Sequence, residues 1–72
     1  MTSSMEKIQE SLKTNIRKFR KKRKFTQFEL GVQTDVTENY IQLLETGIRK
    51  PSLEVLCKLA DALGVEPYEL LK

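Results

Sequence analysis

The sequence predicts an all-α fold, with five helices in one compact domain that spans residues 1–72. Three observations support this prediction. Apolar residues recur every three or four positions along the chain, which is the spacing of one helix face. Strict alternation of apolar and polar residues, the mark of a half-buried strand, is found nowhere. Helix start and stop signals divide the chain into five segments, and a chain of this length builds a single core.

The first helix is predicted from a stripe of apolar residues. Ser3 and Glu6 have the spacing of a capping box, which predicts where the helix begins. Its end is expected at residues 22–24, where cations suit the negative end of a helix. We expect the stripe to pack inside the core. It consists of Met5, Ile8, Leu12, Ile16 and Phe19.

The second helix is predicted over residues 27–34. Thr26 and Glu29 have the spacing of a capping box, in which the hydroxyl accepts from an amide three residues on and the carboxylate reaches back. Asp35 follows at a position that needs left-handed backbone, which Asp tolerates better than most residues. Gly31 lies inside this helix and is expected to cost about 1 kcal/mol of stability relative to Ala.

A third helix is predicted over residues 38–46, with Thr37 as its N-cap and Gly47 as its stop. Only three or four residues separate it from the second helix, which is the spacing of a helix-turn-helix. At about 100° per residue, its side chains divide into an apolar face and an opposite face that we expect to be exposed. The expected exposed face consists of Glu38, Asn39, Gln42, Leu43 and Thr46.

Two further helices complete the predicted fold. Ser52 is the expected N-cap of a fourth helix over residues 53–63, and Gly64 is its stop. Pro67 suits the first position of a fifth, short helix that is expected to reach Leu71. No internal repeat, linker or low-complexity segment interrupts this order.

The residue types on the exposed face of the third helix suit the recognition of base edges. Asn39 and Gln42 carry amides that can make bidentate contacts to adenine, and Glu38 can accept a hydrogen bond from the cytosine amino group. Leu43 suits contact with a thymine methyl group. Polar residues on an exposed helix are normally only solvated, so this face gains its meaning from the short helix before it.

Charge also favours a nucleic-acid partner. The net charge is +3, and residues 13–24 carry eight cations and no acid. Residues 51–72 carry two cations against four acids. This segregation suits a polyanion better than a membrane surface, although a charge run is by itself often only a solvated face.

Composition argues against several classes of protein. No apolar run approaches the roughly 18 residues of a membrane span, and residues 1–10 lack a signal-peptide core, so a cytoplasmic location is expected. Histidine is absent and Cys57 is the one cysteine, which argues against a zinc site and removes the usual general base. We expect no enzyme, metal, cofactor or small-molecule ligand. Cys57 is expected to pack in the core as a small apolar residue.

Five segments of the chain spell a resemblance to a known family. They are Phe25-Thr26-Gln27-Phe28-Glu29-Leu30, Val36-Thr37-Glu38-Asn39-Tyr40-Ile41, Leu44-Glu45-Thr46-Gly47, Arg49-Lys50-Pro51-Ser52-Leu53 and Leu59-Ala60-Asp61-Ala62-Leu63-Gly64-Val65. Together they closely resemble the Cro and lambda-repressor type (Xre-like) of helix-turn-helix protein, over about residues 12–71 without a gap. The resemblance implies a five-helix DNA-binding domain, a two-fold dimer and a roughly palindromic operator.

The resemblance also implies roles for individual residues. It assigns base reading to Glu38, Asn39 and Leu43, and a structural ion pair between the first and third helices to Arg20 and Glu45. The expected contacts with DNA phosphates are Gln27, Thr37, Tyr40, Arg49 and Lys50, joined by Arg23 and Lys24 because they lie nearest the second helix.

The last segment carries more apolar surface than a short helix can easily bury alone. One interpretation is that it caps the core, and the other is that it forms the two-fold contact that sets two recognition helices about 34 Å apart. The expected contact residues are Pro67, Tyr68, Leu70 and Leu71. The sequence thus predicts a homodimeric repressor that binds double-stranded DNA. The alternative is a protein-interaction adaptor or an antitoxin component with the same fold.

Overall fold

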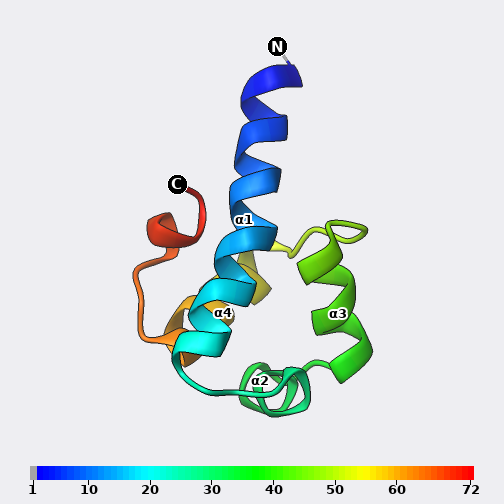
Figure 1. Cartoon of the computed structure of the whole chain (residues 1–72), viewed down its shortest axis with the longest axis vertical. Helices are drawn as coiled ribbons and strands as arrows, with labels where there is room; N and C mark the ends of the chain where they lie inside the picture. Colours follow the sequence, from blue (N-terminus) through cyan, green and yellow to red (C-terminus); the bar gives the residue numbers. More distant parts are fainter. Residues whose placement is uncertain (1) are drawn as a thin grey trace.

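The structure is a computed structural model that describes residues 2–72. Four α-helices and a 3₁₀ helix follow one another along the chain, and the described residues contain no strand (Figure 1). No helix in this part of the chain is long and apolar enough to cross a membrane. The elements are α1 (Thr2–Lys22), α2 (Gln27–Thr34), α3 (Glu38–Thr46), α4 (Leu53–Leu63) and η1 (Pro67–Leu70).

The bounds of α2, α3 and α4 agree with the sequence-based prediction because their cap residues act as expected. The Thr26 hydroxyl accepts from the Glu29 amide at 3.0 Å, and the Glu29 carboxylate accepts from the Thr26 amide at 2.8 Å. The Thr37 hydroxyl accepts from the Tyr40 amide at 3.0 Å. Asp35 has φ 60° and ψ 41°, so it supplies the left-handed residue that ends α2.

Two predictions about the ends of the fold are wrong. α1 begins at Thr2, so Ser3 lies within the helix instead of capping it, and the Ser3 side chain lies outside the described residues. The last helix is 3₁₀ and ends at Leu70. Its amides bond three residues back, with Glu69 donating to the Glu66 carbonyl at 2.9 Å. A single turn of this length favours the tighter 3₁₀ pattern.

The core lies where α1, α2, α3, α4 and η1 meet. η1 is held against the middle of α1 by the Asn15 side-chain amide, which donates to the carbonyls of Glu69 at 3.3 Å and Leu70 at 3.1 Å. The largest fully buried apolar side chains come from every element: Ile16, Leu30, Ile41, Leu44, Leu59 and Leu70.

The prediction that the whole stripe of α1 is buried is wrong for its first two members. Leu12 and Ile16 are buried, but Met5 is 63% exposed and Ile8 is 45% exposed. Figure 1 shows that the first turns of α1 project beyond the other described elements, and Met5 and Ile8 border an open groove instead of packing in the core. Core packing therefore explains only the C-terminal half of the stripe.

Cys57 is exposed, contrary to the prediction that it packs in the core. The buried face of α4 is made by Leu56, Leu59, Ala60 and Leu63. Cys57 follows Leu56 by one position, and a step of about 100° around the helix turns it away from that face. The surrounding segment is largely apolar, although Lys58 follows directly, and the position of Cys57 on the helix is not a core position.

Candidate nucleic-acid interface

α3 presents opposite faces to the core and to the outside. Ile41 and Leu44 are buried on the inner face. Glu38, Asn39 and Gln42 are exposed on the outer face, in the first half of the helix. The predicted set Glu38, Asn39, Gln42 and Leu43 therefore lies on one side of α3, with Leu43 half-buried at its edge.

The turn between α2 and α3 is tight and fixed by backbone bonds. The Val36 amide donates to the Gly31 carbonyl at 2.9 Å, and the Asp35 amide donates to the Val32 carbonyl at 3.3 Å. A Cβ on Gly31 would lie 2.7 Å from the Val36 carbonyl oxygen. The glycine inside α2 thus allows the chain after the turn to approach the helix closely, which gives a physical reason for a residue that weakens a helix.

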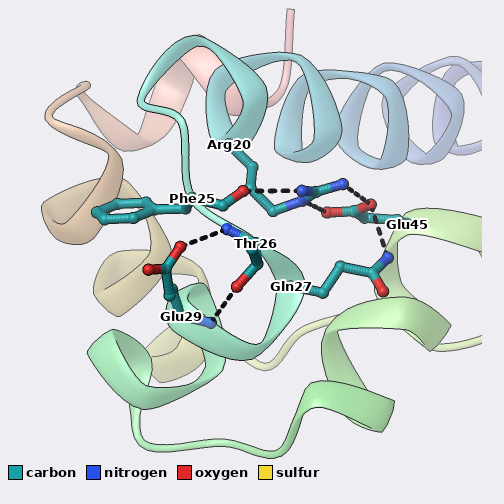
Figure 2. Close-up of polar contacts among 6 residues, drawn as sticks. All are labelled: Arg20, Phe25, Thr26, Gln27, Glu29 and Glu45. Carbon is teal, nitrogen blue, oxygen red and sulfur yellow. Dashed lines mark hydrogen bonds and ion pairs between the residues drawn. The ribbon is translucent and has the colours of Figure 1, made fainter.

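An ion pair ties α3 to α1, as the resemblance implies (Figure 2). The Arg20 guanidinium donates to the Glu45 carboxylate through Nε at 2.6 Å and through Nη2 at 3.0 Å. Its third bond goes from Nη1 to the Phe25 carbonyl at 2.9 Å. The side chains are 10% and 4% exposed, so the pair is largely withdrawn from water. Arg20 therefore fixes both α3 and the start of the segment that leads into α2.

Gln27 joins the same network at the first position of α2. Its Nε2 donates to the Glu45 carboxylate at 3.1 Å, and Figure 2 shows the side chain extended from α2 toward α3. The residue is half-buried, so its position is set by the chain itself. The N-terminus of α2 and the recognition face of α3 are thereby held in one rigid arrangement.

The other predicted phosphate contacts lie on both sides of α3. Thr37 is exposed at its start, and Tyr40 is half-buried one turn later. Arg49 and Lys50 are exposed in the segment that follows Gly47, where the Arg49 amide donates to the Leu43 carbonyl at 3.1 Å. Thr37, Arg49 and Lys50 thus flank α3 along the chain, and Tyr40 lies within it.

Two residues of the basic run differ in their surroundings. Lys24 is exposed and has φ 61°, a left-handed conformation at the end of α1. Arg23 turns to the C-terminus of α4, where Nη1 donates to the Leu63 carbonyl at 3.5 Å. Cations are favourable at that end of a helix. Arg23 is thus bonded within the chain but remains exposed, and its contact with phosphate stays a prediction.

The predicted dimer contact is only partly available. Leu70 is fully buried among the core residues, so its prediction as a contact residue is wrong. Pro67 and Leu71 are half-buried. Tyr68 is 62% exposed, with the Lys72 ammonium 5.5 Å from the centre of its ring.

Ile48 lies beside the predicted phosphate contacts Arg49 and Lys50 and is an exposed apolar residue that the sequence-based prediction did not name. It is 71% exposed, directly before Arg49 and Lys50. It lies between two helices, where no apolar periodicity exists to single it out. The one available signal was an isolated branched residue in a polar, basic turn.

Comparisons with known proteins agree with this geometry. The helix-turn-helix family pattern matches residues 16–70. An uncharacterized HTH-type transcriptional regulator, y4dJ from Sinorhizobium fredii, is 34% identical over 58 residues, which cover 81% of this chain and 75% of that protein. The crystal structure of the hypothetical transcription factor NHTF from Neisseria has a TM-score of 0.85 and 32% identity, covering 90% of this chain and 75% of that one.

Two other solved structures are similar to this chain. The clp gene regulator ClgR from Corynebacterium glutamicum has a TM-score of 0.83 and 31% identity, covering 89% of this chain and 68% of that one. The restriction-modification controller protein C.AhdI from Aeromonas hydrophila has a TM-score of 0.81 and 29% identity, covering 92% and 97%. The fold of these regulators is thus reproduced over most of the described residues.

Proposed function

Because the chain belongs to the helix-turn-helix family of the Cro and lambda-repressor type, we propose that it represses transcription as a dimer bound to a palindromic operator. The family is one of DNA-binding transcriptional regulators and is not enzymatic. The observation that carries the proposal is the exposed face of α3, with Glu38, Asn39 and Gln42 in its first half. The dimer, the operator symmetry and the repression are the steps that go beyond family membership.

In this proposal α3 enters the major groove and reads base edges. Asn39 and Gln42 offer bidentate amides to adenine, and Leu43 at the edge of the face meets a thymine methyl group. The side chains project from a helix fixed by the Arg20–Glu45 pair and by a rigid turn. This rigidity supports specificity, because a mismatched base leaves a donor or acceptor unpaired.

Glu38 acts against most sequences. Its carboxylate is exposed at the first position of α3 and brings negative charge toward a polyanion. The cytosine amino group can offset that repulsion with a hydrogen bond, whereas guanine and thymine present acceptors that cannot. We therefore assign Glu38 to the rejection of other bases, a role that lowers overall affinity and raises discrimination.

Phosphate contacts set the orientation of α3 in the groove. Gln27 at the start of α2 and Thr37 at the start of α3 lie beside backbone amides that suit an anion. Tyr40, Arg49 and Lys50 contact the DNA phosphates as well, and Lys24 extends this set of contacts beyond α2. Such contacts position the protein without reading the sequence.

Two copies on one operator follow from the size of a single reading face. One short helix covers only a few base pairs, and two-fold symmetry doubles the site without a second kind of surface. A bound domain can then repress by occupying the site that polymerase needs. The solved relatives are themselves described as a clp gene regulator and a controller protein, which supports a regulatory role.

Selection from a random duplex library with the purified chain, followed by sequencing, tests the proposal. We expect enrichment of two inverted half-sites with centres one helical turn apart, about 34 Å. General, salt-sensitive binding with no enriched sequence would contradict the proposal. That outcome would favour a protein-interaction adaptor or an antitoxin component.

A further inference from the structure

The projecting half of α1 carries an apolar face that the chain leaves uncovered. Met5 is 63% exposed and Ile8 is 45% exposed, and both continue the stripe that Leu12 carries into the core. Figure 1 shows this stretch of α1 rising beyond the level at which α4 begins. A surface helix of a monomer normally turns such a face inward, so this one is incomplete in the isolated chain.

A groove lies at the base of this projection. It has a volume of about 540 Å³ and runs between the N-terminal half of α1, the start of α4 and the end of the chain. Leu53, at the first position of α4, is 76% exposed on its wall. Most of the lining is apolar, with Met5, Ile8, Leu12, Leu53, Leu56 and Leu71, and Lys50 also lines the groove.

We propose that a second copy of this chain fills the groove with the same stretch of its own α1, in an antiparallel two-fold contact. This inference rests on the proposed function in that it names the partner surface of the dimer. One copy holds both a projecting apolar ridge and an apolar groove beside it. Such self-complementary surface is what an isologous dimer requires, since each copy then gives its ridge and receives the partner's.

Charge on the projecting stretch also fits a second copy. It carries Glu6, Lys7, Glu10 and Lys13, two acids and two bases. Glu6 and Lys13 lie on the same side of α1, where both line the hollow beside Gly47. An antiparallel partner therefore brings the partner's Lys13 toward Glu6, and the partner's Glu6 toward Lys13. Opposite charges at the edge of a helix pair fix its orientation.

The same balance argues against DNA as the occupant. The cations of residues 17–24 have no acid among them, whereas the projecting stretch is neutral and apolar on its open face. A polyanion gains nothing from such a face, while a second apolar helix gains the burial of Met5, Ile8 and Leu53. The C-terminal segment keeps a part in the contact through Leu71, which forms one wall of the groove.

Sedimentation equilibrium of the full chain over a concentration series tests the proposal. The wild type is expected to dimerise, and Ile8→Glu is expected to raise the dissociation constant at least about 100-fold, because it buries a carboxylate in an apolar contact. Leu53→Glu is a second variant, and its carboxylate suits the first turn of α4. Val32→Glu is the control, since Val32 is 62% exposed on α2 and lies away from the groove.

Each variant is first checked for wild-type helical content. Ile8 and Leu53 are exposed, so we expect their replacement to leave the fold intact. A wild type that stays monomeric overturns the proposal. So does a dimer that both groove variants leave unchanged. Equal weakening by Val32→Glu also overturns it, because the contact is then not specific to the groove.

Oxidative cross-linking provides an independent measurement. With Cys57 replaced by Ser, an Ile8→Cys chain is expected to form a disulfide between two copies. The proposed antiparallel contact brings Ile8 of each copy close to the two-fold axis of the dimer. A Val32→Cys chain in the same background is expected to stay uncross-linked. The reverse pattern overturns the proposal.

Failure of this inference is separable from failure of the proposed function. A wild type that selects inverted half-sites while Ile8→Glu leaves its dimer intact keeps the operator and rejects the groove. A dimer that Ile8→Glu disrupts, together with no enriched DNA sequence, keeps the groove and rejects the operator.

Discussion

Arg20 shows how much of the architecture depends on a single side chain. Its three bonds reach Glu45 on α3 and the Phe25 carbonyl before α2, so one guanidinium joins three segments. The pair is too withdrawn from water to behave as a surface salt bridge. Removal of one partner leaves the other charge buried, which is the costly case for an ion pair.

Arg20→Ala is predicted to lower the free energy of unfolding by about 3–5 kcal/mol, because Glu45 is then left without its counter-charge. Urea denaturation followed by circular dichroism measures the change. Arg20→Lys keeps the charge but loses the paired geometry. Its free energy of unfolding is expected to lie between those of wild type and Arg20→Ala. Lys58→Ala removes a pair with Glu54 that is 42% and 79% exposed, and it is expected to cost at most about 1 kcal/mol. Equal stability of Arg20→Ala and wild type would contradict this account.

Lys24 adopts a backbone conformation that its side chain disfavours. With φ 61° it is left-handed, a region that costs a residue with a Cβ about 1–2 kcal/mol. Lys24→Gly is therefore predicted to raise the free energy of unfolding by about 1 kcal/mol, or the Tm by about 4–8 °C. The same variant is expected to weaken DNA binding, because it removes a cation beside α2.

Lys24→Gln separates the two effects of that substitution. Gln carries no charge but disfavours left-handed backbone as Lys does, so it is expected to weaken DNA binding as much as Gly does without raising stability. Thermal unfolding and a DNA titration on the same samples measure both quantities. If Lys24 contacts phosphate, we expect Lys24→Gly to be more stable than wild type and to bind DNA more weakly. Unchanged DNA affinity would remove Lys24 from the proposed interface.

At the scale of the elements, the bounds of α2, α3 and α4 could be predicted accurately because their cap residues are recognisable in the sequence. Thr26, Thr37 and Ser52 act locally by accepting from amides three residues on, and the Asp35 amide donates to carbonyls three and four residues back. The sequence positions of these residues therefore fix the helix bounds. The type of the last helix was harder to predict, since a single turn is decided by what it packs against. η1 is held by Asn15 from a distant part of the chain.

The exposure of individual positions was the less predictable property. Met5 and Ile8 continue a good apolar stripe, yet they are exposed because they border an open groove and are not packed in the core. Cys57 lies among apolar neighbours in sequence but off the buried face of α4. Periodicity tells which side of a helix is apolar, and only the packing of the whole chain tells how far that side is covered.

The segment after α3 is predicted to supply affinity without specificity. Lys50→Ala is expected to weaken binding about equally to all duplexes and to lower the salt dependence of binding by about one phosphate contact. Binding titrations over a series of salt concentrations measure this change. Lys58→Ala removes a lysine from α4, outside the predicted DNA contacts and the groove lining, and is expected to leave both quantities unchanged. A change confined to certain sequences would contradict a phosphate role for Lys50.

At the scale of the whole molecule, the distribution of charge and apolar surface separates two tasks. The exposed face of α3 and its cationic surroundings suit DNA, while the apolar ridge and groove beside the N-terminal half of α1 suit a second copy. Lys50 borders both surfaces, because it also lines the groove. The first surface could be predicted from the sequence, because helix periodicity and residue chemistry define it. The groove could not, because three separate segments create it only when the chain has folded.

A chain completed by a second copy is predicted to unfold at a temperature that depends on its concentration. Association stabilises the folded state by mass action, so the Tm of the wild type is expected to rise as the protein is concentrated. Ile8→Glu is expected to unfold at one Tm throughout the same series. Scanning calorimetry at several concentrations measures both, and a constant Tm for the wild type would contradict a dimer in this range.

Comparison of the DNA sequences selected by wild type and by Glu38→Gln tests whether the exposed face of α3 reads bases. Gln lacks the charge that favours cytosine and offers an amide that suits adenine. We expect the preferred base to change at one pair of symmetry-related positions, while the other positions are retained. Identical selected sequences, or a uniform loss of binding with no changed position, would contradict it.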